Sequence, residues 1–307
     1  MIEVNELTKR YGRATAVDGL GFTARPGRVT GFLGPNGAGK STTLRMLLGL
    51  DEPTSGTALV GGRRFRDHAR GLRHVGALLE AGDVHGGRNG RDHLRVLARS
   101  NRIPAARVDA VLEEVGLAAA ARRRIGGYSL GMRQRLGIAA ALLGDPPVLL
   151  FDEPLNGLDP EGVLWVRGLF RRLAAEGRTV FVSSHLMSEM ENTADHLVVI
   201  GRGRLIADQP LADFAARGPG FRVLVRTPEP ERLTGLLTAA GATVRSVPEG
   251  LEAVGISADR IGELAFEHRV LLRELAPRGA SLEDAFMELT ADSVEYTTAN
   301  SSQGGHA

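Results

Sequence analysis

The segment from Gly34 to Ser41 constrains this chain more than any other feature. It reads Gly34-Pro35-Asn36-Gly37-Ala38-Gly39-Lys40-Ser41 and fits the pattern G-x-x-x-x-G-K-[ST]. A buried strand is predicted before it, at residues 29–33, and a helix is predicted after it, from Lys40 to about Leu50. Glycines let consecutive backbone N–H groups point at phosphate oxygens, and the helix N-terminus adds its dipole. The segment therefore predicts a phosphate-binding loop in an α/β fold.

Residues at the end of this loop suit a nucleoside triphosphate with Mg²⁺. Lys40 can reach the β- and γ-phosphates as a compact charge, and the Ser41 hydroxyl can bind Mg²⁺; we assign Thr42 to the same nucleotide-binding set. Of the 38 Lys and Arg residues only Lys9 and Lys40 are lysine, which makes an accidental match rare. The same scarcity excludes a GTPase, because no N-K-x-D signature is present.

Composition narrows the classes of protein further. With 307 residues and 43% hydrophobic residues, the chain is long enough for about two domains with sizeable cores. Cysteine is absent, which excludes disulfides, thiolate metal sites and Fe–S clusters. The formal net charge of +2 argues against a dedicated nucleic-acid binder. No apolar run approaches the roughly 18 residues of a transmembrane helix, and the N-terminus does not resemble a secretory signal.

The order of apolar runs predicts two domains. Through residue 215, strands such as 148–151 and 179–183 alternate with helices such as 162–176, as in an α/β domain with a largely parallel sheet. A Gly-Pro linker at 217–220 follows. Residues 221–290 then read as β-α-β-β-α-β, a small α+β domain of ferredoxin-like type, with a short terminal helix. Residues 291–307 contain little that could be buried, and we expect them to be disordered.

Two carboxylates follow the strand 148–151. Open α/β sheets place ligands at the carboxyl ends of their strands, where Asp152 and Glu153 stand. Asp152 is suited to the Mg²⁺ shell, and Glu153 to polarising an attacking water. The alternative, that two acids merely cap the next turn, loses weight once the phosphate loop is considered.

A second anion-binding feature begins at Ser129. The sequence Tyr128-Ser129-Leu130-Gly131-Met132-Arg133-Gln134-Arg135 opens an apolar helix, and Ser129 is a natural N-cap. This helix end presents a hydroxyl, a close glycine backbone and a positive dipole to an anion. An ordinary capped core helix is the open alternative.

With these motifs in order, residues 1–210 resemble the ATP-binding subunit of ABC transporters. The Ser129 segment resembles the family's signature motif, matching at Ser129 and Gly131. Asn156-Gly157-Leu158-Asp159 is similar to its D-loop, with Asp159 as the matching residue, and His185 resembles its switch histidine. Tyr11 takes the place of the aromatic residue that stacks on adenine.

The resemblance implies a head-to-tail homodimer on ATP. Ser129 and Gly131 of one copy would contact the γ-phosphate held by Lys40 of the other. Glu153 would orient water, and His185 would hold the γ-phosphate and water in register. Glu80 stands where the family usually has a glutamine that contacts Mg²⁺ and water, so it joins the expected catalytic and metal residues, with an added negative charge.

The resemblance also implies a partner. One phosphate loop without a membrane span is typical of a separate ATPase subunit on a transmembrane permease, cytoplasmic and peripheral on the inner membrane face. The short signature helix and residues 281–290 look like ABC-2 export ATPases, which include exporters of drugs, antibiotics and lipids. The apolar stripe Leu282, Phe286 and Leu289 predicts packing on the small domain, with dimer or permease contact as the alternative.

Rivals to the transporter interpretation are soluble ABC ATPases that act on the ribosome or on DNA. Ribosome-acting members are expected to carry two such domains, and this chain carries one phosphate loop. DNA-repair members place a long coiled coil between the phosphate loop and the signature, and the interval from Lys40 to Tyr128 is too short for one. No nucleic-acid partner is therefore expected.

Overall fold

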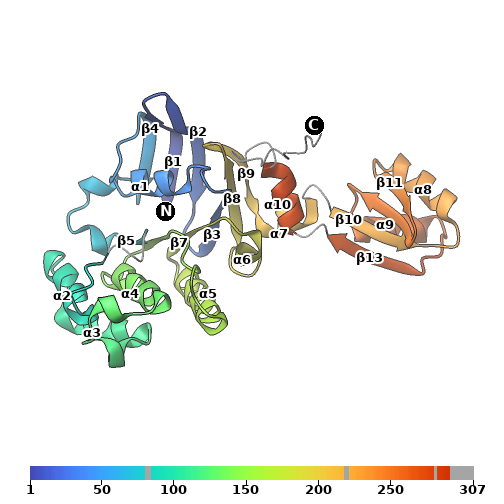
Figure 1. The fold of residues 1–307 in the computed structure, drawn as a ribbon. Helices are drawn as coiled ribbons and strands as arrows, with labels where there is room; N and C mark the ends of the chain where they lie inside the picture. The colour runs from blue at the N-terminus through green and yellow to red at the C-terminus, as the bar shows by residue number, and fades with distance from the viewer. Residues whose placement is uncertain (80–83, 218–220, 280–281, 291–307) are drawn as a thin grey trace, which may run out of the picture.

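The computed structural model describes residues 1–79, 84–217, 221–279 and 282–290 (Figure 1). Glu80 and the predicted disordered tail, residues 291–307, lie outside the described residues. Within the described ranges, no helix is both long enough and apolar enough to cross a membrane.

A six-stranded sheet forms the centre of the first domain. Its strand order is β5-β6-β7-β3-β8-β9, and all neighbours are parallel except β8 and β9. These strands are β3 (Arg28–Leu33), β5 (Val75–Leu78), β6 (Val148–Phe151), β7 (Thr179–Ser184), β8 (His196–Gly201) and β9 (Arg204–Pro210). β6 is buried along its whole length, because helices and a second sheet cover both faces. The predicted parallel α/β core is confirmed.

A second, antiparallel sheet packs on the first through aromatic side chains. Its order is β2-β1-β4, built from β1 (Ile2–Tyr11), β2 (Ala14–Ala24) and β4 (Ser55–Val60). Phe22 of β2 stacks on Phe181 of β7 with ring centroids 5.5 Å apart, and Phe32 of β3 lies 5.1 Å from Phe181. α1 (Lys40–Leu47) joins this core through its buried residues Leu44 and Leu47. The helix ends before the predicted Leu50, since Gly49 takes a positive φ of 63°.

Helices gather at one end of the central sheet and along one face (Figure 1). They are α2 (Gly90–Ser100), α3 (Ala105–Glu114), α4 (Leu130–Leu142), α5 (Pro160–Ala175) and α6 (Met187–Glu191). Short 3-10 turns occupy Phe65–Asp67, Gly71–Arg73, Ala118–Ala120 and Ile125–Gly127. Asp159 caps α5 by accepting a hydrogen bond from the Gly162 N–H, and Pro160 starts the helix. Helix α5 therefore begins two residues before the predicted start at 162.

The C-terminal region forms its own four-stranded antiparallel sheet. The element order is β10 (Phe221–Arg226), α8 (Pro230–Ala239), β11 (Thr243–Val247), β12 (Gly250–Val254), α9 (Ala258–Glu267) and β13 (Glu274–Gly279). The strand order β11-β12-β10-β13 confirms the ferredoxin-like arrangement. The last strand, β13, pairs with β10 antiparallel from Glu274 to Gly279.

The terminal helix packs elsewhere than predicted, so the prediction that its apolar stripe covers the small domain is wrong. Among the described residues, α10 (Leu282–Thr290) lies against α6 rather than, as predicted, on the small domain, and its buried Ala285 and Phe286 belong to the same apolar core as Met187 and Met190 of α6. An apolar stripe shows which face of a helix is buried but not which surface covers it. α7 (Leu211–Arg217) leads out of the first domain and α10 leads back to it (Figure 1).

Candidate functional site: a phosphate loop facing two carboxylates

The loop between β3 and α1 has the backbone that the motif predicts. Gly37 and Gly39 have positive φ angles of 80° and 100°. A Cβ atom on Gly39 would lie 2.5 Å from the Ala16 carbonyl oxygen, so only glycine fits. Gly34 N donates to the Ser184 carbonyl of β7 at 3.3 Å, and Ala38 N donates to the Pro35 carbonyl at 3.1 Å. The loop is therefore fixed to the carboxyl edge of the sheet, at the N-terminus of α1.

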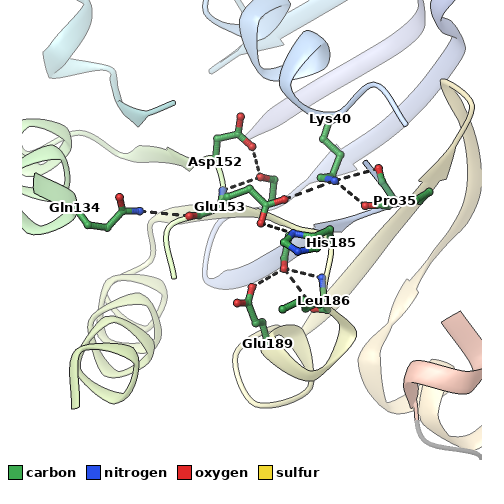
Figure 2. A network of polar contacts seen from close by, with 11 residues as sticks. Pro35, Lys40, Gln134, Asp152, Glu153, His185, Leu186 and Glu189 are labelled. Carbon is green, nitrogen blue, oxygen red and sulfur yellow. Dashed lines mark hydrogen bonds and ion pairs between the residues drawn. The ribbon is translucent and has the colours of Figure 1, made fainter. Parts of the chain in front are cut away.

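Lys40 folds back across this loop. Its Nζ donates to the carbonyl oxygens of Gly34 at 2.6 Å and Pro35 at 3.3 Å, and lies 3.6 Å from Glu153 Oε1 (Figure 2). The residue is only 6% exposed. Burial lowers the pKa of Lys40, while the negative charges of Glu153 and Asp152 oppose that shift. Both carboxylates thus act on the lysine electrostatically, although β7 separates their strand from β3 in the sheet.

Ser183 holds the two carboxylate residues at the end of β6. Its hydroxyl donates to Asp152 Oδ1 and accepts from the Glu153 backbone N–H at 3.0 Å. Asp152 is 8% exposed, so this buried carboxylate is well placed for a cation. The Ser41 hydroxyl, in the first turn of α1, is a second hard oxygen donor of the kind Mg²⁺ prefers. Glu80 lies outside the described residues.

Glu153 joins the lysine to the histidine. Glu153 Oε2 accepts a hydrogen bond from His185 Nδ1 at 2.9 Å, while Oε1 faces Lys40 (Figure 2). Because a carboxylate only accepts, His185 carries a proton on Nδ1, which leaves Nε2 free to contact another group. Glu153 also has a left-handed φ of 47°, unusual for a residue other than glycine. Strained backbone of this kind is common at catalytic sites.

The predicted signature residues lie at the N-terminus of α4. Ser129 caps the helix by accepting a hydrogen bond from Met132 N at 3.2 Å. Leu130 is 55% exposed and lies against Gly157, where a Cβ would come within 2.1 Å of its side chain. The signature and the Asn156–Asp159 segment therefore form one surface. Ser129 bonds to Met132 and Asp159 bonds to Gly162, while Gly131 faces Leu158 and Gly157.

Tyr11 lies at the end of β1, beside the hairpin that contacts the phosphate loop. Its hydroxyl donates to Asp51 Oδ2 at 2.8 Å, and its ring is 49% exposed. Lys9 Nζ lies 4.8 Å from the ring centroid and donates to the Glu52 carbonyl oxygen at 2.6 Å. The Tyr11 ring is therefore accessible to a ligand, while Asp51 holds its hydroxyl and Lys9 contacts one face.

Three contributors to the site went unassigned in the sequence analysis. They are Ser183, the buried Gln134, whose amide donates to the Glu153 carbonyl at 3.4 Å, and Glu189, which accepts from Ser184. Gln134 stands inside the quoted signature segment and Ser183 ends the predicted strand 179–183, so the position of each was a usable signal. Glu189 has no such signal, since only the fold brings it to Ser184.

The fold and the loop define a phosphate-loop nucleotide-binding protein, and comparisons specify its family. Residues 17–156 match the ABC transporter family, and residues 221–283 match a domain of unknown function (DUF8746). The chain is 43% identical to the bacitracin transport ATP-binding protein BcrA of Bacillus licheniformis over 220 residues, 71% of this chain and 72% of that protein. It is 37% identical to the Nod factor export ATP-binding protein I of Paraburkholderia xenovorans (strain LB400), over 96% of this chain and 98% of that one.

A solved structure of the ATP-binding subunit of an ABC transporter superposes with a TM-score of 0.65 at 25% identity, over 86% of this chain and 99% of that chain. The chain therefore belongs to the ATP-binding subunits of ABC transporters. It is an ATPase.

Proposed function

We propose that this ATPase drives a separate membrane permease that exports drugs, antibiotics or lipids. The observation that carries the proposal is the Lys40–Glu153–His185 arrangement at the phosphate loop, in a chain whose described helices include no membrane span. Relatives named for bacitracin transport and Nod factor export support an export role. We further propose that residues 1–215 form the ATP-binding unit and residues 221–279 an accessory unit.

The residues at the loop suggest how ATP is held. Lys40 would leave the Gly34 and Pro35 carbonyls and bind the β- and γ-phosphates, assisted by the backbone N–H groups of the loop. Ser41 and Asp152 would hold Mg²⁺, which neutralises phosphate charge when bound. Mg²⁺ in such sites is usually bound by one or two protein oxygens together with substrate phosphates and water. Tyr11 would stack on the adenine.

The hydrolytic roles follow from the charges around Glu153. The Glu153 carboxylate would accept a hydrogen bond from the attacking water. The ammonium of Lys40 balances the negative charge of this carboxylate. His185, oriented by Glu153 through Nδ1, would present Nε2 to the γ-phosphate and water. Glu80 would contribute to the same water and metal site.

Within the described residues, the signature surface is exposed at Ser129 and Leu130, and a second copy would cover it. We propose a head-to-tail homodimer in which Ser129 and Gly131 face the γ-phosphate of the other copy, with Asp159 nearby. The exposed N-terminus of α4 favours an anion through its dipole. Hydrolysis would then remove an interface element and weaken the dimer.

Affinity purification from native membranes tests the proposal. We expect a transmembrane permease to co-purify and ATP hydrolysis to depend on Lys40. If DNA or ribosomes instead stimulated hydrolysis while no membrane protein co-purified, a soluble ABC ATPase without a permease would be the correct function.

A further inference from the structure

A hydrogen-bonded chain leads from helix α6 to the histidine of the site. Ser184 ends β7 and directly precedes His185. The Ser184 hydroxyl donates to Glu189 Oε2 at 2.5 Å and accepts from the Leu186 backbone N–H at 3.0 Å (Figure 2). The hydroxyl thereby closes the turn that carries His185.

Glu189 determines the orientation of the Ser184 hydroxyl. A serine has one proton to donate, and the alternative acceptor, the Leu186 carbonyl, lies 3.4 Å away. The carboxylate is both closer and charged, so it takes the proton in a charge-assisted hydrogen bond. With the proton fixed there, a serine lone pair is directed at Leu186 N.

The helix that carries Glu189 is anchored at several points. Met187 and Met190 are fully buried in the main apolar core, and Thr193 Oγ1 donates to the Glu189 carbonyl oxygen at 2.7 Å. α10 packs on the outside of α6. Glu189 is therefore held in place by its helix, and its hydrogen bond to Ser184 fixes the position of the turn 184–186.

We propose that Glu189 is a positioning residue for ATP hydrolysis, acting through Ser184 to hold the turn that directs His185 at Glu153. The inference rests on the proposed roles of His185 and Glu153. Glu189 itself does not contact nucleotide in this role; its effect is confined to the orientation of the histidine.

Steady-state ATPase assays on the purified full chain test this role. Glu189→Ala should lower kcat about ten- to a hundredfold, as expected for loss of a charge-assisted hydrogen bond within a reacting arrangement. KM and ATP affinity should stay within about twofold, because the phosphate loop is untouched. Glu189→Gln retains an oxygen acceptor for Ser184 and should restore kcat to within about threefold of the parent. Glu191→Ala removes an exposed carboxylate from the same helix and serves as the matched control.

A double-mutant cycle distinguishes positioning from a structural role. In a His185→Ala background, Glu189→Ala should cost little further activity, because the group that it positions is gone. An equal loss in both backgrounds would overturn the proposal, as would a loss that follows the unfolding midpoint across all variants. If the parent protein showed no hydrolysis that depends on Lys40, the proposed function itself would be wrong. If the parent turned over normally but Glu189→Ala lowered activity equally in both backgrounds, only the role of Glu189 would be refuted.

Discussion

Glu153 and His185 share a 2.9 Å hydrogen bond at the phosphate loop, and the same carboxylate lies 3.6 Å from Lys40. One side chain thus orients the histidine and balances the charge of the lysine. Both contacts depend on the negative charge of Glu153. An isosteric, uncharged replacement of this residue should therefore separate ATP binding from ATP hydrolysis.

Glu153→Gln should leave ATP binding intact and slow hydrolysis by about 10²- to 10⁴-fold, the range for a general base. The amide preserves the shape but cannot accept a proton, while Lys40 is free to bind phosphate. Single-turnover hydrolysis and size-exclusion chromatography with Mg-ATP would measure the rate and the accumulating dimer. Glu191→Gln is the control for loss of one carboxylate, and unchanged turnover in Glu153→Gln would rule out a catalytic role.

Lys40→Ala should abolish tight ATP binding, because no other ammonium is available in the loop. Lys40→Arg should also bind poorly: the residue is 6% exposed, its ammonium lies between two carbonyls, and a planar guanidinium does not fit that space. Lys9→Arg is the matched control on the chain's other lysine. Equilibrium binding of a fluorescent ATP analogue checks the series, and micromolar affinity retained by Lys40→Ala would refute the phosphate-loop assignment.

Tyr11→Ala should weaken ATP binding about tenfold if the half-exposed ring stacks on adenine, given roughly 1–3 kcal/mol per stacked base. Tyr11→Phe keeps the ring and loses only the hydrogen bond to Asp51, so its affinity should match that of the parent. Competition of ATP against a triphosphate with a non-aromatic base would show whether the loss is specific to the base. Equal affinities for all three proteins would exclude stacking.

The sequence predicts the part of this site that short motifs encode. The loop 34–41, the acids after β6 and the histidine after β7 all lie at strand ends, so a parallel sheet must bring them to one edge. Lys9 could not be interpreted from sequence, because its hydrogen bond to the Glu52 carbonyl joins segments that are distant in the chain.

The role of Glu189 and the packing partner of α10 were also missed. The partner of Glu189 is set by the turn between β7 and α6, and α10 reaches α6 only after the chain has passed through the small domain. Periodicity and composition carry no information about such pairings, which tertiary packing selects. The motifs at strand ends could therefore be predicted, whereas the support around His185 depends on how the turn between β7 and α6 folds and could not.

Glu189 should also affect stability in a pH-dependent way. Burial raises the pKa of Glu189 above its ordinary value of 4.5, and the charge of Glu153 adds to the shift, while Ser184, His185 and Arg167 oppose it. Between 4.5 and the raised pKa the folded state binds more protons than the unfolded state, so this residue lowers stability as pH rises through that window. Glu189→Gln should therefore gain stability over the parent from about pH 4.5 upward, with a constant difference above the raised pKa.

Urea unfolding of parent and Glu189→Gln between pH 4 and pH 8 would measure this difference, at about one pH unit per step. Glu191→Gln should show no such pH-dependent gain. A parent that became more stable than Glu189→Gln with rising pH would contradict the direction of the pKa shift. A residue that costs stability but supports hydrolysis is expected where function opposes folding.

Phe286→Ala should destabilise the first domain rather than the small domain. Phe286 is 4% exposed in the core that includes Met187 and Met190, so its truncation should cost about 3 kcal/mol, at the low end for buried phenylalanine. Loosening α6 should also lower kcat through Glu189, with ATP affinity unchanged. Met287→Ala, at a position 57% exposed on the same helix, should change stability by less than about 0.5 kcal/mol. Hydrogen exchange would locate the effect: faster exchange confined to β10–β13 would show that α10 supports the small domain instead.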